Sequence, residues 1–375
     1  MKNKIWMLFL MSICIAASCK KNKSTAQVPP VTPPLATVAY RGADLSFIPE
    51  IETTPTIYYN SNGQAQDALT ILKNSGMNIV RLRLWHSPAN GNSGLAQVEA
   101  FAQRIKAAGL QWWLDIHYSD TWADPGQQTP PAAWQAASYA NQLDSVYNYT
   151  YSVMNDLKNK NILPIIVQVG NETNSGMLWN IGKVGGSFDA NWPQYAGLVK
   201  KGILAVKTID PSIKVMLHFA GTNGASWFYN NLQTQGVNYD IIGLSYYHWW
   251  HNRNLSELQT DLTALANTFN KDIFIAETAY PFSLGWNDYT NNIFGSSTTL
   301  LPGYDASPAG QLKFLSDLRT VIAAVPNNHG LGFCYWEPAW VAYRGNAASN
   351  GSPWENLALF DFNNKALAAL AAYTP

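Results

Sequence analysis

The 375-residue chain has few charged side chains, no excess of either charge and only three cysteines. Lysine and arginine together number 24, as do aspartate and glutamate, so no basic surface indicates nucleic acid binding and no acidic tail indicates disorder. Cys14 and Cys19 lie in an N-terminal segment with the pattern of a lipoprotein signal, in which Cys14 would be removed and Cys19 acylated. Only Cys334 would then remain as a thiol, which excludes an internal disulfide framework. We therefore expect no nucleic acid partner and an uncharged ligand.

Aromatic residues are plentiful by contrast, with 15 tryptophans and 19 tyrosines. Large rings dominate core packing, and we expect about half of these residues to serve that purpose. The others have flat faces that can stack on the apolar C–H faces of sugar rings while polar neighbours bind the hydroxyls. The composition therefore favours a carbohydrate ligand.

The N-terminus has the pattern of a secretory signal, with Lys2 and Lys4 before an apolar stretch at 5–15. The segment Ala17-Ser18-Cys19 resembles a bacterial lipobox, so we predict a signal peptide at 1–18 and lipidation of Cys19; an ordinary signal peptide is the alternative. Residues 19–37, with VPPVTPP, read as a flexible tether. The predicted location is the bacterial cell envelope, with the lipid anchor as the one membrane contact.

Residues 38–375 alternate strand-like and helix-like segments, which predicts βα units and a parallel sheet. We predict eight strands, at 39–46, 78–85, 111–119, 164–172, 214–221, 241–247, 272–280 and 330–337. Helical spacing appears between them at 64–75, 95–108, 139–159, 193–209, 255–270 and 308–325. Eight is the number that closes a (β/α)₈ TIM barrel, which we predict as a single catalytic domain. The competing fold is a doubly wound open sheet, which typically has a glycine-rich G-x-G-x-x-G phosphate loop after an early strand. No such loop follows an early strand here.

Two glutamates, Glu172 in VQVGNETNSG and Glu277 in IFIAETAYP, end the fourth and seventh predicted strands. In such a barrel the C-terminal strand ends form the active face, and two carboxylates there can cleave a glycosidic bond. Asn171 precedes Glu172 and could donate to a sugar hydroxyl, which favours Glu172 as acid/base. Glu277 would be the nucleophile, and hydrogen-bond donors or a cation near its carboxylate would keep it ionised. Carboxyl groups about 5–5.5 Å apart give retention, and about 6.5–9.5 Å gives inversion.

Arg81, Arg83 and Tyr247 are the groups we expect to support Glu277, because they lie on the second and sixth predicted strands. A metal held by His117 with Asp120 is the competing interpretation of those two residues. A usual zinc site needs a third protein ligand, and neither H-E-x-x-H nor a cysteine pair is present. We therefore expect no metal in catalysis and no required cofactor.

Several longer segments resemble those of the endo-β-1,4-galactanases of glycoside hydrolase family 53. They include RGADLSFIPEIE, NIVRLRLWHSP, HYSDTWADPGQQTPPAAW, VQVGNETNSGMLW, GLSYYHWW, IAETAYPF and CYWEPAWV, and the likeness runs from about residue 40 to 362. It implies an endo-acting, retaining hydrolase of β-1,4-galactan or arabinogalactan in pectin side chains, which we expect to be a monomer. It also implies sugar-binding roles for Asp44, His86, His117, Asp120, Trp122, Asn171, Tyr247, Trp336 and Trp354.

Two segments depart from the family pattern. His248 stands where relatives commonly have proline, within His248-Trp249-Trp250-His251. The segment 341–355 is short and lacks aspartate, whereas some relatives bind a structural calcium there; Asn346, Asn350 and Ser352 offer no charge to a hard cation. Two alternatives stay open, a related barrel acting on another β-1,4-linked backbone and a non-catalytic lipoprotein that captures glycan.

Overall fold

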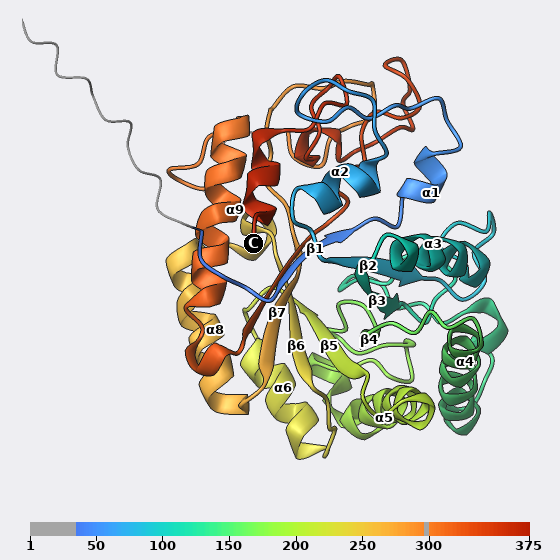
Figure 1. The fold of residues 1–375 in the computed structure, drawn as a ribbon. Helices are drawn as coiled ribbons and strands as arrows, with labels where there is room; N and C mark the ends of the chain where they lie inside the picture. The colour runs from blue at the N-terminus through green and yellow to red at the C-terminus, as the bar shows by residue number, and fades with distance from the viewer. Residues whose placement is uncertain (1–34, 296–299) are drawn as a thin grey trace, which may run out of the picture. The chain divides into compact units, whose positions relative to one another are not determined.

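The eight predicted strands form a closed parallel barrel in the computed structural model, which describes residues 35–295 and 300–375. Each strand pairs with its neighbour in sequence, and the last strand pairs with the first (Figure 1). The strands are β1 (Tyr40–Asp44), β2 (Ile79–Leu84), β3 (Gln111–Ile116), β4 (Ile166–Val169), β5 (Lys214–Ala220), β6 (Ile241–Tyr246), β7 (Asp272–Thr278) and β8 (Gly330–Tyr335). The predicted (β/α)₈ fold is confirmed.

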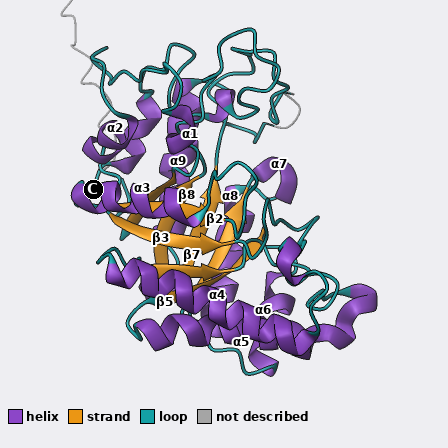
Figure 2. Ribbon diagram, turned by 90° about the vertical axis from the view of Figure 1, so that its right-hand side faces the viewer, coloured by secondary structure: helices purple, strands orange, loops and turns teal. Residues whose placement is uncertain are grey.

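Helices surround the barrel, and the orange strands of Figure 2 lie inside a purple layer. They are α1 (Ile48–Ile51), α2 (Ala68–Asn74), α3 (Leu95–Ala107), α4 (Tyr139–Asn159), α5 (Trp192–Ile209), α6 (Ala225–Thr234), α7 (His248–His251), α8 (Leu255–Phe269) and α9 (Pro308–Ala323). Helices α1, α6 and α7 were missing from the prediction. Helices α1 and α7 have only four residues each, too few to show a helical period. Helix α6 has 10 residues and an apolar face with buried Ala225, Phe228, Tyr229 and Leu232, which the prediction overlooked.

The N-terminal predictions remain untested. The signal peptide at 1–18, lipidation of Cys19 and most of the tether at 19–37 lie outside the described residues. Residues Leu35–Pro375 form one compact unit. Within the described part of the chain, no helix combines the length and apolar character needed to cross a membrane.

The barrel interior is built in layers. An apolar layer contains one or two inward-facing residues from each strand after β1: Ile79, Trp113, Ile166, Met216, Ile241, Phe274, Ala276 and Cys334. Since side chains alternate along a strand, residues two positions further on β2 to β5 also face inward. Those residues are Arg81, Asp115, Gln168 and His218, and all four are buried. A polar layer therefore lies above the apolar one, toward the C-terminal ends of the strands.

Strand ends differ from prediction where the two glutamates lie. Strand β4 stops at Val169, because Gly170 and Glu172 adopt positive φ angles of 85° and 44° that a strand cannot contain. Glu172 therefore lies on a turn beyond the strand, whereas Glu277 lies within β7. The pairing of β6 with β7 skips Ala276, and this irregularity turns Glu277 toward the barrel mouth.

Candidate active site

Glu277 lies at the barrel mouth in contact with a cation and a phenol. Its Oε1 is 2.8 Å from an Arg81 guanidinium nitrogen, and its Oε2 accepts a 3.0 Å hydrogen bond from the Tyr247 hydroxyl. Burial raises the pKa of the Glu277 carboxyl, and Arg81 opposes that rise. The structure thus places Arg81 and Tyr247 where the sequence predicted support for Glu277.

Arg81 is the central cation of the polar layer. It also pairs with Asp44 at 3.0 Å and Asp115 at 2.8 Å, and it donates to the side-chain oxygen of Asn171 at 2.8 Å. Although burial alone raises the pKa of Asp115, Arg81 and then His117 bring it below its ordinary value. A single arginine therefore offsets the charge of several buried carboxylates.

Replacing Arg81 with methionine is expected to lower the free energy of unfolding by about 3–5 kcal/mol, because buried carboxylates lose their cation. Urea unfolding followed by circular dichroism would measure the change. The matched control is Arg104→Met, whose partners Glu52 and Asp67 are at least one-third exposed. That substitution should cost less than about 1 kcal/mol. Equal losses in the two variants would contradict the central role of Arg81.

Glu172 lies opposite, partly exposed to the cleft. Its Oε1 accepts a 2.5 Å hydrogen bond from the Ser245 hydroxyl. Burial, followed by the nearby charge of Glu277, raises the pKa of Glu172 to about 8. The Glu172 carboxyl can therefore hold a proton at neutral pH.

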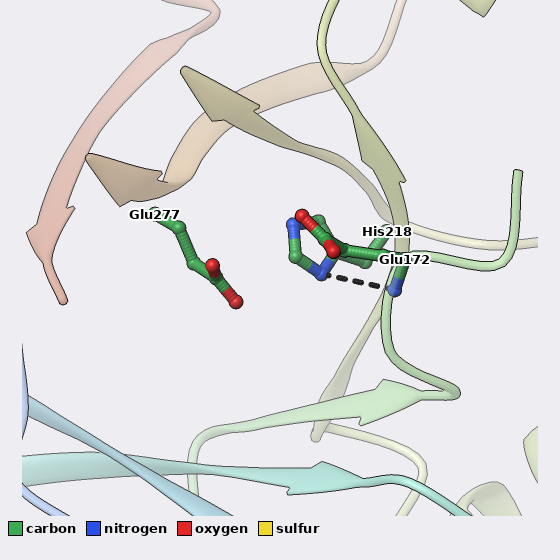
Figure 3. A group of neighbouring side chains, drawn as sticks. All are labelled: Glu172, His218 and Glu277. Atoms are coloured by element: carbon green, nitrogen blue, oxygen red, sulfur yellow. Dashed lines mark hydrogen bonds between the residues drawn. The ribbon is translucent and has the colours of Figure 1, made fainter. Parts of the chain in front are cut away.

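The two glutamates are close together. One carboxylate oxygen from each, together with a ring nitrogen of His218, lie within 4.8 Å of one another (Figure 3). This upper bound on the distance between the two oxygens agrees with the roughly 5–5.5 Å spacing of carboxyl groups associated with a covalent intermediate, and it is shorter than the roughly 6.5–9.5 Å that admits a water.

The same three side chains offer possible metal ligands, but all of their donor atoms except Oε2 of Glu172 are already engaged. Glu277 is paired through both oxygens, and Glu172 Oε1 is bonded to Ser245. His218 contacts Ser245 through Nε2 and Asn171 through Nδ1. A metal would have to displace contacts of both Glu277 and His218, so acid–base chemistry fits the cluster better.

The residues considered for other metals do not gather around a common point. His117 bonds to Asp115 and to the backbone N–H of Ala123, whereas Asp120 accepts backbone N–H groups of the neighbouring loops. In the segment after β8, Asn346 and Asn350 are exposed. The Ser352 hydroxyl donates to a backbone carbonyl at 2.7 Å. These side chains do not fit a hard cation, which needs several oxygens turned toward it.

A cleft of about 550 Å³ opens above the glutamates. Most of the predicted site residues line it: Asp44, Arg81, Arg83, His117, Trp122, Asn171, Glu172, Tyr247, Glu277, Trp336 and Trp354. Trp354 is almost fully buried and donates its indole N–H to the Trp336 carbonyl, with the two rings 4.6 Å apart. Trp354 therefore holds Trp336 in place from behind.

Two predicted roles are not matched by the contacts. Arg83 pairs with Glu337 at 3.2 Å and lies over the rings of Phe47 and Trp122, so the expectation that it supports Glu277 was wrong. The reason is register, since Arg83 lies one inward position further along β2 than Arg81.

His86 and Asp120 are not among the residues that line the cleft. Asp120 instead joins two loops through the backbone N–H groups of Ser87 and Ala132, and His86 packs on Trp134. Both therefore lie at the C-terminal end of the barrel but turn away from its opening.

Asn171 has its side-chain nitrogen committed to the Ala123 carbonyl at 2.8 Å, and its oxygen accepts from Arg81. One amide hydrogen remains for another acceptor, so the prediction that Asn171 donates to a sugar hydroxyl stays untested.

Sequence reasoning missed several residues of the mouth. His218 and Ser245 lie on β5 and β6 and are fully buried. In the sequence, each of them is a polar residue within an otherwise apolar strand. Such a side chain finds its hydrogen-bond partner only when the barrel closes. Trp250, from the segment His248–His251 that departs from the family pattern, is half exposed and lines the cleft. Trp340 also lines the cleft but is mostly buried.

The arrangement defines a class of enzyme. The barrel opening holds one cation-paired carboxylate, one carboxyl that can keep a proton, and a cleft with tryptophan walls. These groups define a glycoside hydrolase. Such an enzyme needs two carboxyl groups that flank the scissile glycosidic bond, one as nucleophile or base and the other as acid.

Comparison with known proteins identifies the family. The chain matches the model of glycosyl hydrolase family 53 over residues 40–373, and it belongs to that family. It is 45% identical over 339 residues to an uncharacterised protein of Niallia circulans, covering 88% of this chain and 92% of that one. It is 37% identical to the arabinogalactan endo-beta-1,4-galactanase of Cellvibrio japonicus, covering 87% of each. The solved GH53 catalytic domain of Ignisphaera aggregans superposes with a TM-score of 0.85 at 39% identity, covering 91% and 97%.

Proposed function

We propose that this protein is an endo-acting, retaining hydrolase of the β-1,4-galactosidic bonds in galactan and type I arabinogalactan. The observation that carries the mechanism is the approach of the Glu172 and Glu277 carboxyl oxygens to within 4.8 Å. The name of the Cellvibrio japonicus relative supports the choice of sugar.

In the first step, Glu277 attacks the anomeric carbon while Glu172 gives its proton to the leaving glycosidic oxygen. The C1–O bond breaks, and a galactosyl ester forms on Glu277. In the second step, Glu172 removes a proton from water, and the water oxygen attacks C1 and releases Glu277. Two inversions at C1 give net retention.

Arg81 and Tyr247 act on Glu277 throughout. Both donate to its carboxylate, which keeps the nucleophile oriented before attack and receives the charge again when the ester breaks. The Tyr247 hydroxyl stays protonated, because burial and then the charge of Glu277 raise its pKa well above the ordinary value. Tyr247 is therefore a donor over the whole working pH range.

The cleft walls supply the sugar contacts in this proposal. Trp122, Trp250 and Trp336 each line the opening, and the rings of Trp122 and Trp336 lie 6.1 Å apart. Indole faces there can stack on successive pyranose rings. The segment after β8 is pinned by hydrogen bonds from Ser352 to Asp288 and from Ile293 to Pro353, so it forms a fixed border of the cleft.

Side-by-side hydrolysis of unbranched β-1,4-galactan, β-1,4-mannan and a soluble cellulose derivative tests the proposal. Galactan is expected to be cleaved at least about tenfold faster than the other two, since the three sugars differ in the orientation of their oxygens at C2 or C4, and a site that bonds one orientation leaves polar groups unpaired with the other. The earliest galactan products should be oligosaccharides of several lengths. Monomer as the sole early product would contradict endo action, and binding without cleavage would favour the glycan-capture alternative.

A further inference from the structure

The two oxygens of the Glu172 carboxyl have different surroundings. Oε1 accepts the Ser245 hydroxyl, whereas no hydrogen bond from the described part of the chain reaches Oε2. Glu172 also lines the cleft, where the sugar bond must lie. The protein therefore occupies one oxygen and leaves the other to the substrate.

Ser245 is itself held from behind by a buried histidine. The His218 Nε2 is 3.0 Å from the Ser245 oxygen, and neither side chain is exposed to solvent. A hydroxyl has one hydrogen and can accept at the same oxygen. Ser245 can thus donate to Glu172 while it accepts the Nε2–H of His218.

The surroundings of His218 favour that direction of donation. Two donors face the Nδ1 of His218: the backbone N–H of Glu172 at 3.3 Å (Figure 3) and the side-chain nitrogen of Gln168 at 3.0 Å. Only one acceptor faces the same atom, the side-chain oxygen of Asn171 at 2.9 Å. Burial, followed by the charge of Arg81, lowers the pKa of His218 well below its usual range. A neutral ring with two donors at Nδ1 carries its single hydrogen on Nε2.

We propose that Ser245, supported by His218, is a positioning residue that occupies Oε1 of Glu172 and so reserves Oε2 for the transferred proton. The proposal rests on the proposed role of Glu172 as acid/base. A carboxyl free to rotate would present its proton to Ser245 as often as to the glycosidic oxygen. The fixed carboxyl directs the proton into the cleft in the first step and receives one from water in the second.

The groups that face Glu172 determine how loss of Ser245 changes its titration. Glu277 on β7 and Asp124 beyond β3 raise the pKa of Glu172, and Arg81 on β2 lowers it. Tyr247 and His218 are uncharged at the working pH. The hydrogen bond from Ser245 also lowers the pKa of Glu172, so its removal must raise that pKa.

The test is the pH profile of galactan hydrolysis by Ser245→Ala. The alkaline limb of kcat/KM is expected to move upward by about one pH unit, the size of a lost hydrogen bond to a charged group. At the optimum, kcat is expected to fall about 10- to 100-fold, because the second step needs the ionised and oriented base. Ser245→Thr keeps the hydroxyl and should restore both values.

Ser119→Ala is the matched control. Ser119 is a buried serine near the barrel opening that is bonded to a loop N–H, and its loss should leave the profile unchanged. Glu172→Gln separates the two hypotheses. If that variant loses the alkaline limb and Ser245→Ala keeps the wild-type limb, the positioning role is overturned while the acid/base role stands. If Glu172→Gln retains the limb, the proposed acid/base role fails first.

Discussion

Replacing Glu277 with alanine is expected to lower kcat on β-1,4-galactan by at least about 10⁴-fold, because a covalent nucleophile cannot be bypassed by its neighbours. The cation of Arg81 and the hydroxyl of Tyr247 would then face an empty site. Concentrated azide is small enough to enter that site and attack C1 of an activated aryl β-galactobioside. The expected product is an α-linked glycosyl azide, since one inversion replaces two. Proton NMR of the product measures its configuration.

Glu355→Gln is a suitable control for Glu277→Ala. Glu355 is also a buried glutamate near the barrel opening, with a pKa raised by burial, but its Oε1 accepts backbone N–H groups of Asn287 and Asp288. Its replacement should leave kcat nearly unchanged. Glu277→Ala with kcat within tenfold of the wild type, or azide giving no new product, would remove Glu277 from the nucleophile role.

Replacing Glu172 with glutamine is expected to lower galactan hydrolysis by about 10²–10⁴-fold, the usual contribution of a general acid–base residue. In the wild type, kcat/KM should fall as pH rises through about 8, because Glu172 then loses the proton that the leaving oxygen requires. The glutamine variant has nothing to titrate there, so its alkaline limb should disappear.

The dependence on the leaving group gives a second readout for Glu172. A dinitrophenyl β-galactobioside needs no proton to depart, so its first chemical step should be almost as fast in Glu172→Gln as in the wild type. A burst of dinitrophenol followed by slow turnover is then expected, because the second step still lacks its base. Equal losses on the dinitrophenyl substrate and on galactan would contradict the acid/base assignment.

Much of the barrel could be predicted because its signals are local. Strands buried on both faces read as apolar runs, and all eight were placed with errors of a few residues at their ends. The positions of Glu172 and Glu277 followed from those runs. The helices α1 and α7 were missed because four residues are too few to show a helical period.

The functional contacts were less predictable. The prediction for Arg83 was wrong, and the roles of His218 and Ser245 were not foreseen, since each depends on residues far away in the chain. Arg83 and Glu337 are 254 positions apart, and Ser245 and Glu172 are 73 apart. Nothing in a single strand indicates which residue of another strand lies at the same height.

The sequence by itself thus determined the eight-strand barrel, the two glutamates at its opening and the family resemblance, because these depend on short-range patterns and motifs. Only the tertiary structure decided the orientation of Glu277, which the skipped pairing of Ala276 turns into the cleft. It also decided that Ser245 contacts one oxygen of Glu172. The physical reason is that closure of the barrel sets the relative heights of its strands, and hydrogen bonds form only between groups that closure brings within about 3 Å.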